Sequence, residues 1–120
     1  MPKTVLIVDD HAGFRGFARR LLEAGGYTVV GEAPDAASAI AAVQALQPEL
    51  VLLDVLLPDT DGIAVAELLA ENDGGPEVVL TSSREAVEFG TRLERSRASG
   101  FIRKDDLTTA AIQEVTAARP

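Results

Sequence analysis

Two apolar runs in the sequence end in carboxylates. Asp9 and Asp10 follow residues 5–8, and Asp54 follows residues 50–53. Short runs rich in Val, Ile and Leu are typical of parallel strands that are buried on both faces. Ligands of open parallel sheets bind in the crevice beyond the carboxyl ends of the strands. We therefore expect the three acids to share one site.

The chemistry of such a site follows from its charges. Clustered carboxylates raise one another's pKa unless a cation neutralises them, and oxygen ligands suit a hard ion such as Mg²⁺. Thr81 and Ser82 follow a third apolar run, and Lys104 follows a fourth. A lysine and a hydroxyl can hold a phosphoryl group. Asp54 would then be the nucleophile that accepts this group as an acyl phosphate.

Two neighbouring motifs have simpler explanations. His11 suggests phosphotransfer, but a single histidine at a helix start is usually only exposed, and we assign it no role. Residues 59–62 superficially resemble a calcium loop or an aspartyl-phosphate hydrolase motif. They lack the later calcium ligands, so we predict a polar turn that caps the next helix.

Strand-like and helix-like periods alternate along the chain and would position these residues. Gly90 and many charges weaken the helical pattern of residues 84–97. Five strand–helix repeats predict a parallel sheet covered on both faces. We expect strands at 4–9, 28–32, 50–54, 77–81 and 100–103, helices at 12–24, 35–46, 62–71, 84–97 and 107–118, and a turn at 72–76.

Composition restricts the class of protein. With 120 residues, of which 47% are hydrophobic, we expect a single domain over 1–120. A net charge of −8 argues against a nucleic-acid or anionic-membrane surface. The chain contains no cysteine, which excludes disulfides and thiolate metal sites. Residues 5–8 are too short for a signal or membrane segment, so we expect a cytoplasmic protein.

Four stretches together resemble the receiver domains of two-component response regulators. They are residues 5–10, 48–58 with 61–62, 78–82 and 100–104. The resemblance implies that Asp54 is the phosphoacceptor and that Asp9, Asp10, Asp54 and the backbone carbonyl of Leu56 hold Mg²⁺. It further implies that Lys104 contacts the phosphoryl group, that Thr81 is the switch hydroxyl with Ser82 as a second candidate, and that Phe101 is the switch aromatic. Asp105 departs from the family pattern, which often has proline there.

The resemblance also implies a fold and a function. The fold would be a flavodoxin-like, doubly wound α/β domain with five parallel strands in the order 2-1-3-4-5 and five helices. A sensor histidine kinase or phosphotransfer protein would supply the phosphoryl group. The face formed by residues 84–97, 100–103 and 107–118 would respond and bind an output domain or a second copy of the chain. We expect no direct contact of this domain with nucleic acid.

Two other functions are compatible with the fold. One is an interaction module that works without phosphorylation, but the full set of site residues argues against it. The other is a magnesium-dependent phosphatase, but 120 residues leave no room for a cap segment. The sequence does not decide whether the chain is a stand-alone regulator or part of a longer one, although residues 9–15 resemble receivers that precede helix-turn-helix domains.

Overall fold

A computed structural model describes residues 3–70 and 75–117. Five parallel strands form one sheet in the order β2-β1-β3-β4-β5, as predicted. The strands are β1 (Thr4–Val8), β2 (Thr28–Ala33), β3 (Leu50–Asp54), β4 (Glu77–Ser82) and β5 (Gly100–Arg103). The helices are α1 (Ala12–Ala24), α2 (Ala36–Leu46), α3 (Gly62–Ala70), α4 (Thr91–Arg95) and α5 (Thr109–Ala117). The predicted doubly wound α/β fold is therefore confirmed.

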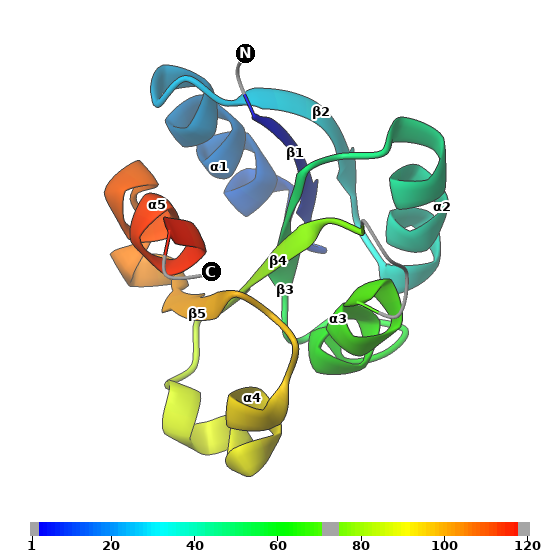
Figure 1. The fold of residues 1–120 in the computed structure, drawn as a ribbon, viewed down its shortest axis with the longest axis vertical. Helices are drawn as coiled ribbons and strands as arrows, with labels where there is room; N and C mark the ends of the chain where they lie inside the picture. The colour runs from blue at the N-terminus through cyan, green and yellow to red at the C-terminus, as the bar shows by residue number, and fades with distance from the viewer. Residues whose placement is uncertain (1–2, 71–74, 118–120) are drawn as a thin grey trace.

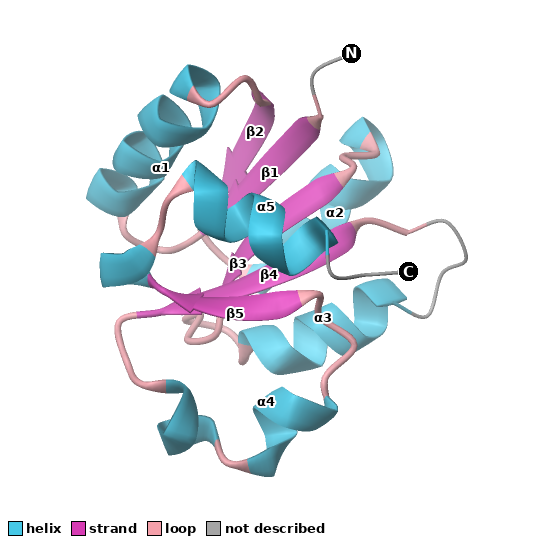
Figure 2. Ribbon diagram, turned by 60° about the vertical axis from the view of Figure 1, so that its left-hand side comes forward, coloured by secondary structure: helices cyan, strands magenta, loops and turns pink. Residues whose placement is uncertain are grey.

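Helices cover both faces of the sheet (Figures 1 and 2). In β1, Val5 and Ile7 pack with α1 and α5, whereas Leu6 and Val8 pack with α2 and α3. This alternation follows from the strand geometry, in which successive side chains point to opposite faces. Because both faces of the central strands β1 and β3 are covered, residues 5–8 and 50–53 are apolar and buried without interruption.

Helix ends follow local capping chemistry. Asp35 accepts a hydrogen bond from the Ser38 amide at the start of α2. Gln47 adopts a left-handed conformation at the end of α2, with φ of 49°. Predicted boundaries differ by one residue at the ends of β1, β2 and β4. The predicted residues Glu71 and Ala118, and most of the predicted turn at 72–76, lie outside the described part of the chain.

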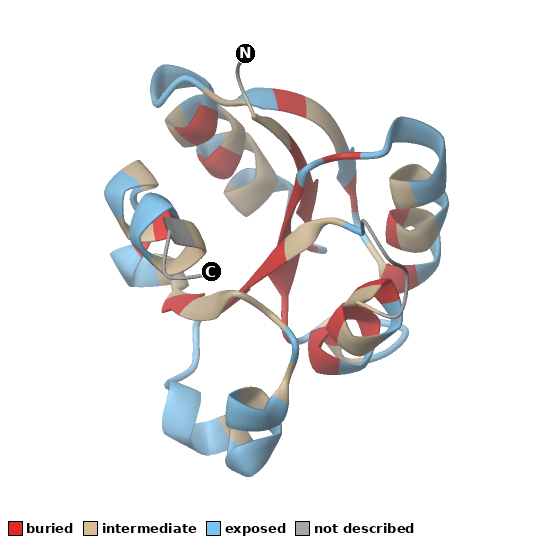
Figure 3. Cartoon of the chain, viewed as in Figure 1, coloured by how far each residue is buried: buried red, intermediate tan, exposed pale blue. Residues whose placement is uncertain are grey.

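The prediction of one helix over 84–97 is wrong. The structure has a 3-10 turn, η1 (Ala86–Phe89), and the short α4, separated by Gly90 with φ of 61°. A positive φ interrupts a right-handed helix and is available to glycine at little cost. Within residues 86–95 only Phe89 and Leu93 are half-buried, and the rest are exposed (Figure 3). This segment is therefore weakly held by apolar packing.

The last helix also begins later than predicted. A second 3-10 turn, η2 (Lys104–Asp106), follows β5, and the Lys104–Asp105 peptide bond is trans. Leu107 is buried but precedes α5. The Thr108 hydroxyl accepts a hydrogen bond from the Ala111 amide, which is N-cap geometry and places the helix start at Thr109.

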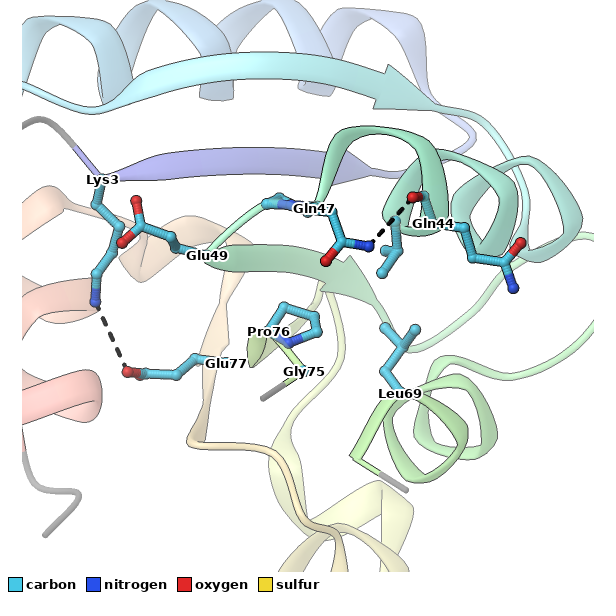
Figure 4. Close-up of a pocket in the computed structure, with 10 residues that line it drawn as sticks. Lys3, Gln44, Gln47, Glu49, Leu69, Gly75, Pro76 and Glu77 are labelled. Atoms are coloured by element: carbon cyan, nitrogen blue, oxygen red, sulfur yellow. Dashed lines mark hydrogen bonds and ion pairs between the residues drawn. The ribbon is translucent and has the colours of Figure 1, made fainter. Parts of the chain in front are cut away.

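A hollow of about 500 Å³ lies between α2, α3 and the amino ends of the strands (Figure 4). Its lining includes Lys3, Gln47, Glu49 and Glu77. Glu49 precedes β3, whereas Asp54 ends the same strand, so this hollow lies at the opposite edge of the sheet from the predicted site. None of the helices in the described residues has the length and hydropathy of a membrane span.

Candidate functional site

The carboxyl edge of the sheet brings Asp9, Asp54, Thr81 and Lys104 together on one face. Each of these four residues lies two positions after a strand residue that packs against α1 and α5. The four packed residues are, in the same order, Ile7, Leu52, Val79 and Ile102. Because side chains at i and i+2 share a face of a strand, the two strand-end aspartates and Thr81 point to the same side. Asp54 and Thr81 are also paired in register across β3 and β4.

Asp54 is buried at the end of β3, with only 3% of its surface exposed. Its Oδ1 accepts a hydrogen bond of 3.1 Å from the Leu56 amide, and its Oδ2 lies 3.3 Å from Lys104 Nζ. Burial and the nearby Asp9 charge raise the pKa of Asp54 to about 6, although the Leu56 amide and Lys104 oppose this change. Additional positive charge at this edge would favour the ionised, nucleophilic form.

Lys104 lies between the two buried acids. Its Nζ is 2.7 Å from Asp9 Oδ2, a contact that is better described as an ion pair than as a well-aligned hydrogen bond. Burial alone would lower the pKa of Lys104, but the close contact with Asp9 and the charge of Asp54 outweigh it, and the pKa is raised. The ammonium group also lies 4.5 Å from the centre of the Phe14 ring. The lysine is therefore held in its charged form beside Asp54.

Asp10 and His11 complete the acidic edge. The Asp10 side chain is 37% exposed, and one potential ligand atom from each of Asp9, Asp10, His11 and Asp54 lies within 4.8 Å of the others. The three carboxylates supply the oxygen ligands that Mg²⁺ requires, so the donor set fits this ion. For Leu56 the structure gives the amide contact with Asp54 and an isolated β-bridge with Asp61, and the role of its carbonyl oxygen stays a prediction.

The two candidate hydroxyls differ in their surroundings. Thr81 Oγ1 is buried and has no hydrogen-bond partner among the residues that the structure describes. Ser82 Oγ instead accepts a hydrogen bond of 3.1 Å from the Arg84 amide. Since it follows Thr81 directly, Ser82 points to the other face of β4, on the side of Leu80. A buried hydroxyl without a partner is costly, so Thr81 is the hydroxyl with unused hydrogen-bonding capacity at the acidic edge.

Comparison with known proteins decides the family. The profile of the response regulator receiver domain matches residues 5–115 of this chain. The chain is a response-regulator receiver domain of a two-component system.

The receiver domain is similar to several known regulators. It is 35% identical over 106 residues to the nitrate/nitrite response regulator protein NarL of Escherichia coli K12, covering 87% of this chain and 49% of that protein. It is 40% identical over 90 residues to the transcriptional regulatory protein PdtaR of Mycobacterium tuberculosis, covering 73% of this chain and 44% of that protein. The chain therefore spans about half of the length of these curated relatives.

Solved structures of receiver domains have the same fold. The signal receiver domain of NarL from Mycobacterium tuberculosis superimposes with a TM-score of 0.85 at 32% identity, covering 98% of both chains. A LuxR-family two-component response regulator from Aurantimonas superimposes with a TM-score of 0.85 at 29% identity, covering 98% of this chain and 84% of that one. Both likenesses agree with the strand order described above.

Phe101 lies on the opposite face of the sheet from Thr81. It is half-buried beside the cluster formed with α2 and α3, and its ring meets Phe89 at 6.0 Å in an edge-on arrangement. Phe101 therefore joins β5 to η1, a segment with little apolar packing. Its change of rotamer with phosphorylation stays a prediction.

Sequence reasoning missed residues that support the site of this receiver domain. Phe14 on α1 faces the Lys104 ammonium. Arg15 Nη1 donates a hydrogen bond of 2.7 Å to the Asp9 carbonyl, and its Nε pairs with Glu32. An aromatic and an arginine one turn after an acidic pair were the available signals.

Residues 55–61, between β3 and α3, connect the site to two helices. Asp61 accepts a hydrogen bond from the Ala64 amide, so the predicted capping of the next helix is confirmed. On α4, Arg92 Nη2 donates hydrogen bonds of 2.9 Å to both carboxylate oxygens of Asp61. Asp59 caps the preceding helix by accepting hydrogen bonds from the first amides of α2. Neither of these two long-range contacts was predicted from the sequence.

Proposed function

We propose that this receiver domain accepts a phosphoryl group on Asp54 from the phosphohistidine of a sensor kinase or phosphotransfer protein. The observation that carries the proposal is the buried Asp54 carboxylate, 3.3 Å from Lys104 Nζ and beside the fully buried Asp9. Such a site excludes water from the nucleophile while leaving one edge to the exposed Asp10. We infer that the domain works in the cytoplasm, where such kinases present their phosphohistidine.

In the proposed reaction an Asp54 oxygen attacks phosphorus. A phosphorus–oxygen bond forms while the phosphorus–nitrogen bond to the donor histidine breaks, and the leaving imidazole takes up a proton. Lys104 stabilises the charge on the phosphoryl oxygens at a fixed position, which costs no reorganisation during the reaction. Mg²⁺ would be held by Asp9, Asp10, Asp54 and the Leu56 carbonyl. Its positive charge would offset the negative charge of the phosphoryl oxygens.

Thr81 supplies the proposed coupling to a conformational change. Its buried, unpartnered hydroxyl would donate a hydrogen bond to a phosphoryl oxygen. Hydrogen bonds to charged groups are worth about 1.5–3 kcal/mol, which changes the ratio of two conformations about 10- to 150-fold. Movement of Thr81 displaces β4, and its neighbour β5 carries both Phe101 and, directly after it, Lys104.

The surface formed by α4, β5 and α5 is the proposed output face, for an output domain or a second copy of the chain. A hollow of about 410 Å³ is lined there by residues of β5, η1 and α5, including Phe101, Arg103 and Val115. The adjoining residues 86–95 are largely exposed and pack weakly, so a second arrangement of them costs little.

Intact-mass measurement with acetyl phosphate and Mg²⁺ tests the phosphoacceptor. The wild type should gain one phosphoryl group, Asp54→Asn should gain none, and the matched Asp59→Asn should behave as the wild type. An equal gain in Asp54→Asn would refute the assignment. A wild type that gains no mass and does not respond to beryllofluoride would favour a phosphorylation-independent interaction module.

A paired substitution tests the switch hydroxyl. In NMR spectra with beryllofluoride, which mimics the phosphoryl group, Thr81→Ala should lose most shift changes in residues 86–103. Ser82→Ala should keep them, because its hydroxyl already caps the turn at Arg84. Loss of the response only in the serine variant would mean that Ser82 is the sensing hydroxyl.

A further inference from the structure

His11 faces the acidic edge with its Nδ1 atom. This atom lies 3.2 Å from Asp9 Oδ1 and 3.1 Å from Asp10 Oδ1. The imidazole belongs to the same group of potential ligand atoms as Asp54, all within 4.8 Å of one another. We propose that His11 is a direct nitrogen ligand for borderline divalent metals such as Co²⁺ and Ni²⁺, so that it sets the metal preference of the acidic site. The inference rests on the metal site of the proposed function.

The distances match those between ligands of a single ion. Bonds of about 2.0–2.2 Å place adjacent ligands roughly 3 Å apart and opposite ligands about 4.2 Å apart. The contacts of Nδ1 with the two aspartate oxygens already have the adjacent spacing. Since the group spans up to 4.8 Å, its outermost ligand atoms need to approach one another by about 0.6 Å. An ion could therefore bind without rearrangement of the β1–α1 loop.

The backbone of His11 is fixed while its ring remains accessible. The His11 amide donates a hydrogen bond of 2.9 Å to Asp9 Oδ1, and the residue is the N-cap of α1. Its side chain makes no capping hydrogen bond and is 70% exposed. The ring is thus not required by the helix, and it can turn its Nδ1 lone pair to an ion when the proton resides on Nε2.

An added imidazole should act selectively among metals. Mg²⁺ is a hard ion that prefers oxygen, so the carboxylates of Asp9, Asp10 and Asp54 satisfy it and a nitrogen ligand adds little. Affinity for mixed nitrogen and oxygen sites rises through Co²⁺ and Ni²⁺, for which imidazole is a good ligand. A histidine that only forms hydrogen bonds with the acids would instead influence all of these ions alike.

The composition of the chain simplifies the assignment of a metal-bound imidazole. His11 is the single histidine and the chain has no cysteine, so any imidazole signal in tag-free protein comes from this residue. Calorimetric titrations with Mg²⁺, Co²⁺ and Ni²⁺ would compare the wild type with His11→Ala, His11→Gln and Asp10→Ala. In the wild type, Co²⁺ should shift the imidazole proton resonances far outside their ordinary range.

We expect the two His11 variants to lose 10- to 100-fold in affinity for Ni²⁺ and Co²⁺ and less than threefold for Mg²⁺. Asp10→Ala should weaken the binding of all three ions. Equal losses for Mg²⁺ and Ni²⁺ in the His11 variants would overturn the inference. So would Ni²⁺ binding that needs His11 but is unchanged in Asp10→Ala, since that describes a lone surface histidine. Failure of the wild type to bind Mg²⁺ would contradict the proposed magnesium site, while the Ni²⁺ result still decides the role of His11.

Discussion

Asp54→Asn should stabilise the receiver domain in the absence of divalent metal. The pKa of Asp54 rises from 3.8 to about 6 on folding, mainly because the carboxyl group is buried. The stabilisation associated with its protonated form is therefore fully present below 3.8 and is lost as the pH rises through about 6. An amide resembles the protonated acid in shape but does not titrate, so the variant avoids this loss.

The size of the effect follows from the two pKa values. Linkage between 3.8 and about 6 gives a difference in unfolding free energy of about 3 kcal/mol at pH 7.5 and about 1.5 kcal/mol at pH 5. Asp54→Asn removes one of the two carboxylate partners of Lys104. The ion pair between Lys104 and Asp9 remains, so the lysine keeps a charged partner in the variant. Carboxyl groups that do not interact with Asp54 titrate alike in both proteins and cancel in the difference.

Urea denaturation between pH 5 and 8 with a chelator would measure this difference. Asp59→Asn is the matched control, because the Ala36 and Ala37 amides hold the pKa of Asp59 below its ordinary value. The stability from Asp59 is present above its unfolded pKa and lost on acidification, so this variant should be less stable than the wild type at pH 7.5. If Asp54→Asn is destabilised at pH 7.5, or its advantage is independent of pH, then burial does not raise the pKa of Asp54 as described.

Two further predictions concern the surroundings of the site. Gly62→Ala should destabilise the fold by about 1–3 kcal/mol in thermal or urea unfolding, because a Cβ there would overlap the backbone carbonyl of Asp54. Gly13→Ala, with open space around it, should be neutral or stabilising by up to about 1 kcal/mol, and similar losses in both variants would contradict the close approach. Arg92→Gln should speed hydrogen exchange in residues 86–95 because it removes the contact with Asp61 in the β3–α3 loop, whereas Arg84→Gln, which breaks only the local pair with Glu88, should change it less. The reverse order would show that the long-range contact does not hold α4.

Patterns of apolar runs were sufficient to predict the sheet and the convergence of Asp9, Asp54 and Lys104. They did not separate Thr81 from Ser82, because both faces of β4 are covered by helices and the run before them shows no alternation. Gly90 was recognised as weakening the fourth helix, but a break there was not predicted because Phe89 and Leu93 keep helical spacing across it.

Contacts that depend on tertiary structure could not be predicted from the sequence. Asp59 caps a helix more than twenty positions earlier in the chain, and only the folded loop brings it there. His11 received no predicted role because sequence gives no information on the orientation of an exposed ring, whereas the fold turns its Nδ1 to two carboxylates.

The site of the phosphoryl group is the most direct test of the proposed function. Borohydride reduces an acyl phosphate to an alcohol and would convert a phosphorylated aspartate to homoserine. After treatment with acetyl phosphate and Mg²⁺, peptide mass spectrometry should find homoserine at position 54 alone. Homoserine at Asp59, Asp61 or another carboxylate, with position 54 unchanged, would contradict the assignment of Asp54 as the phosphoacceptor.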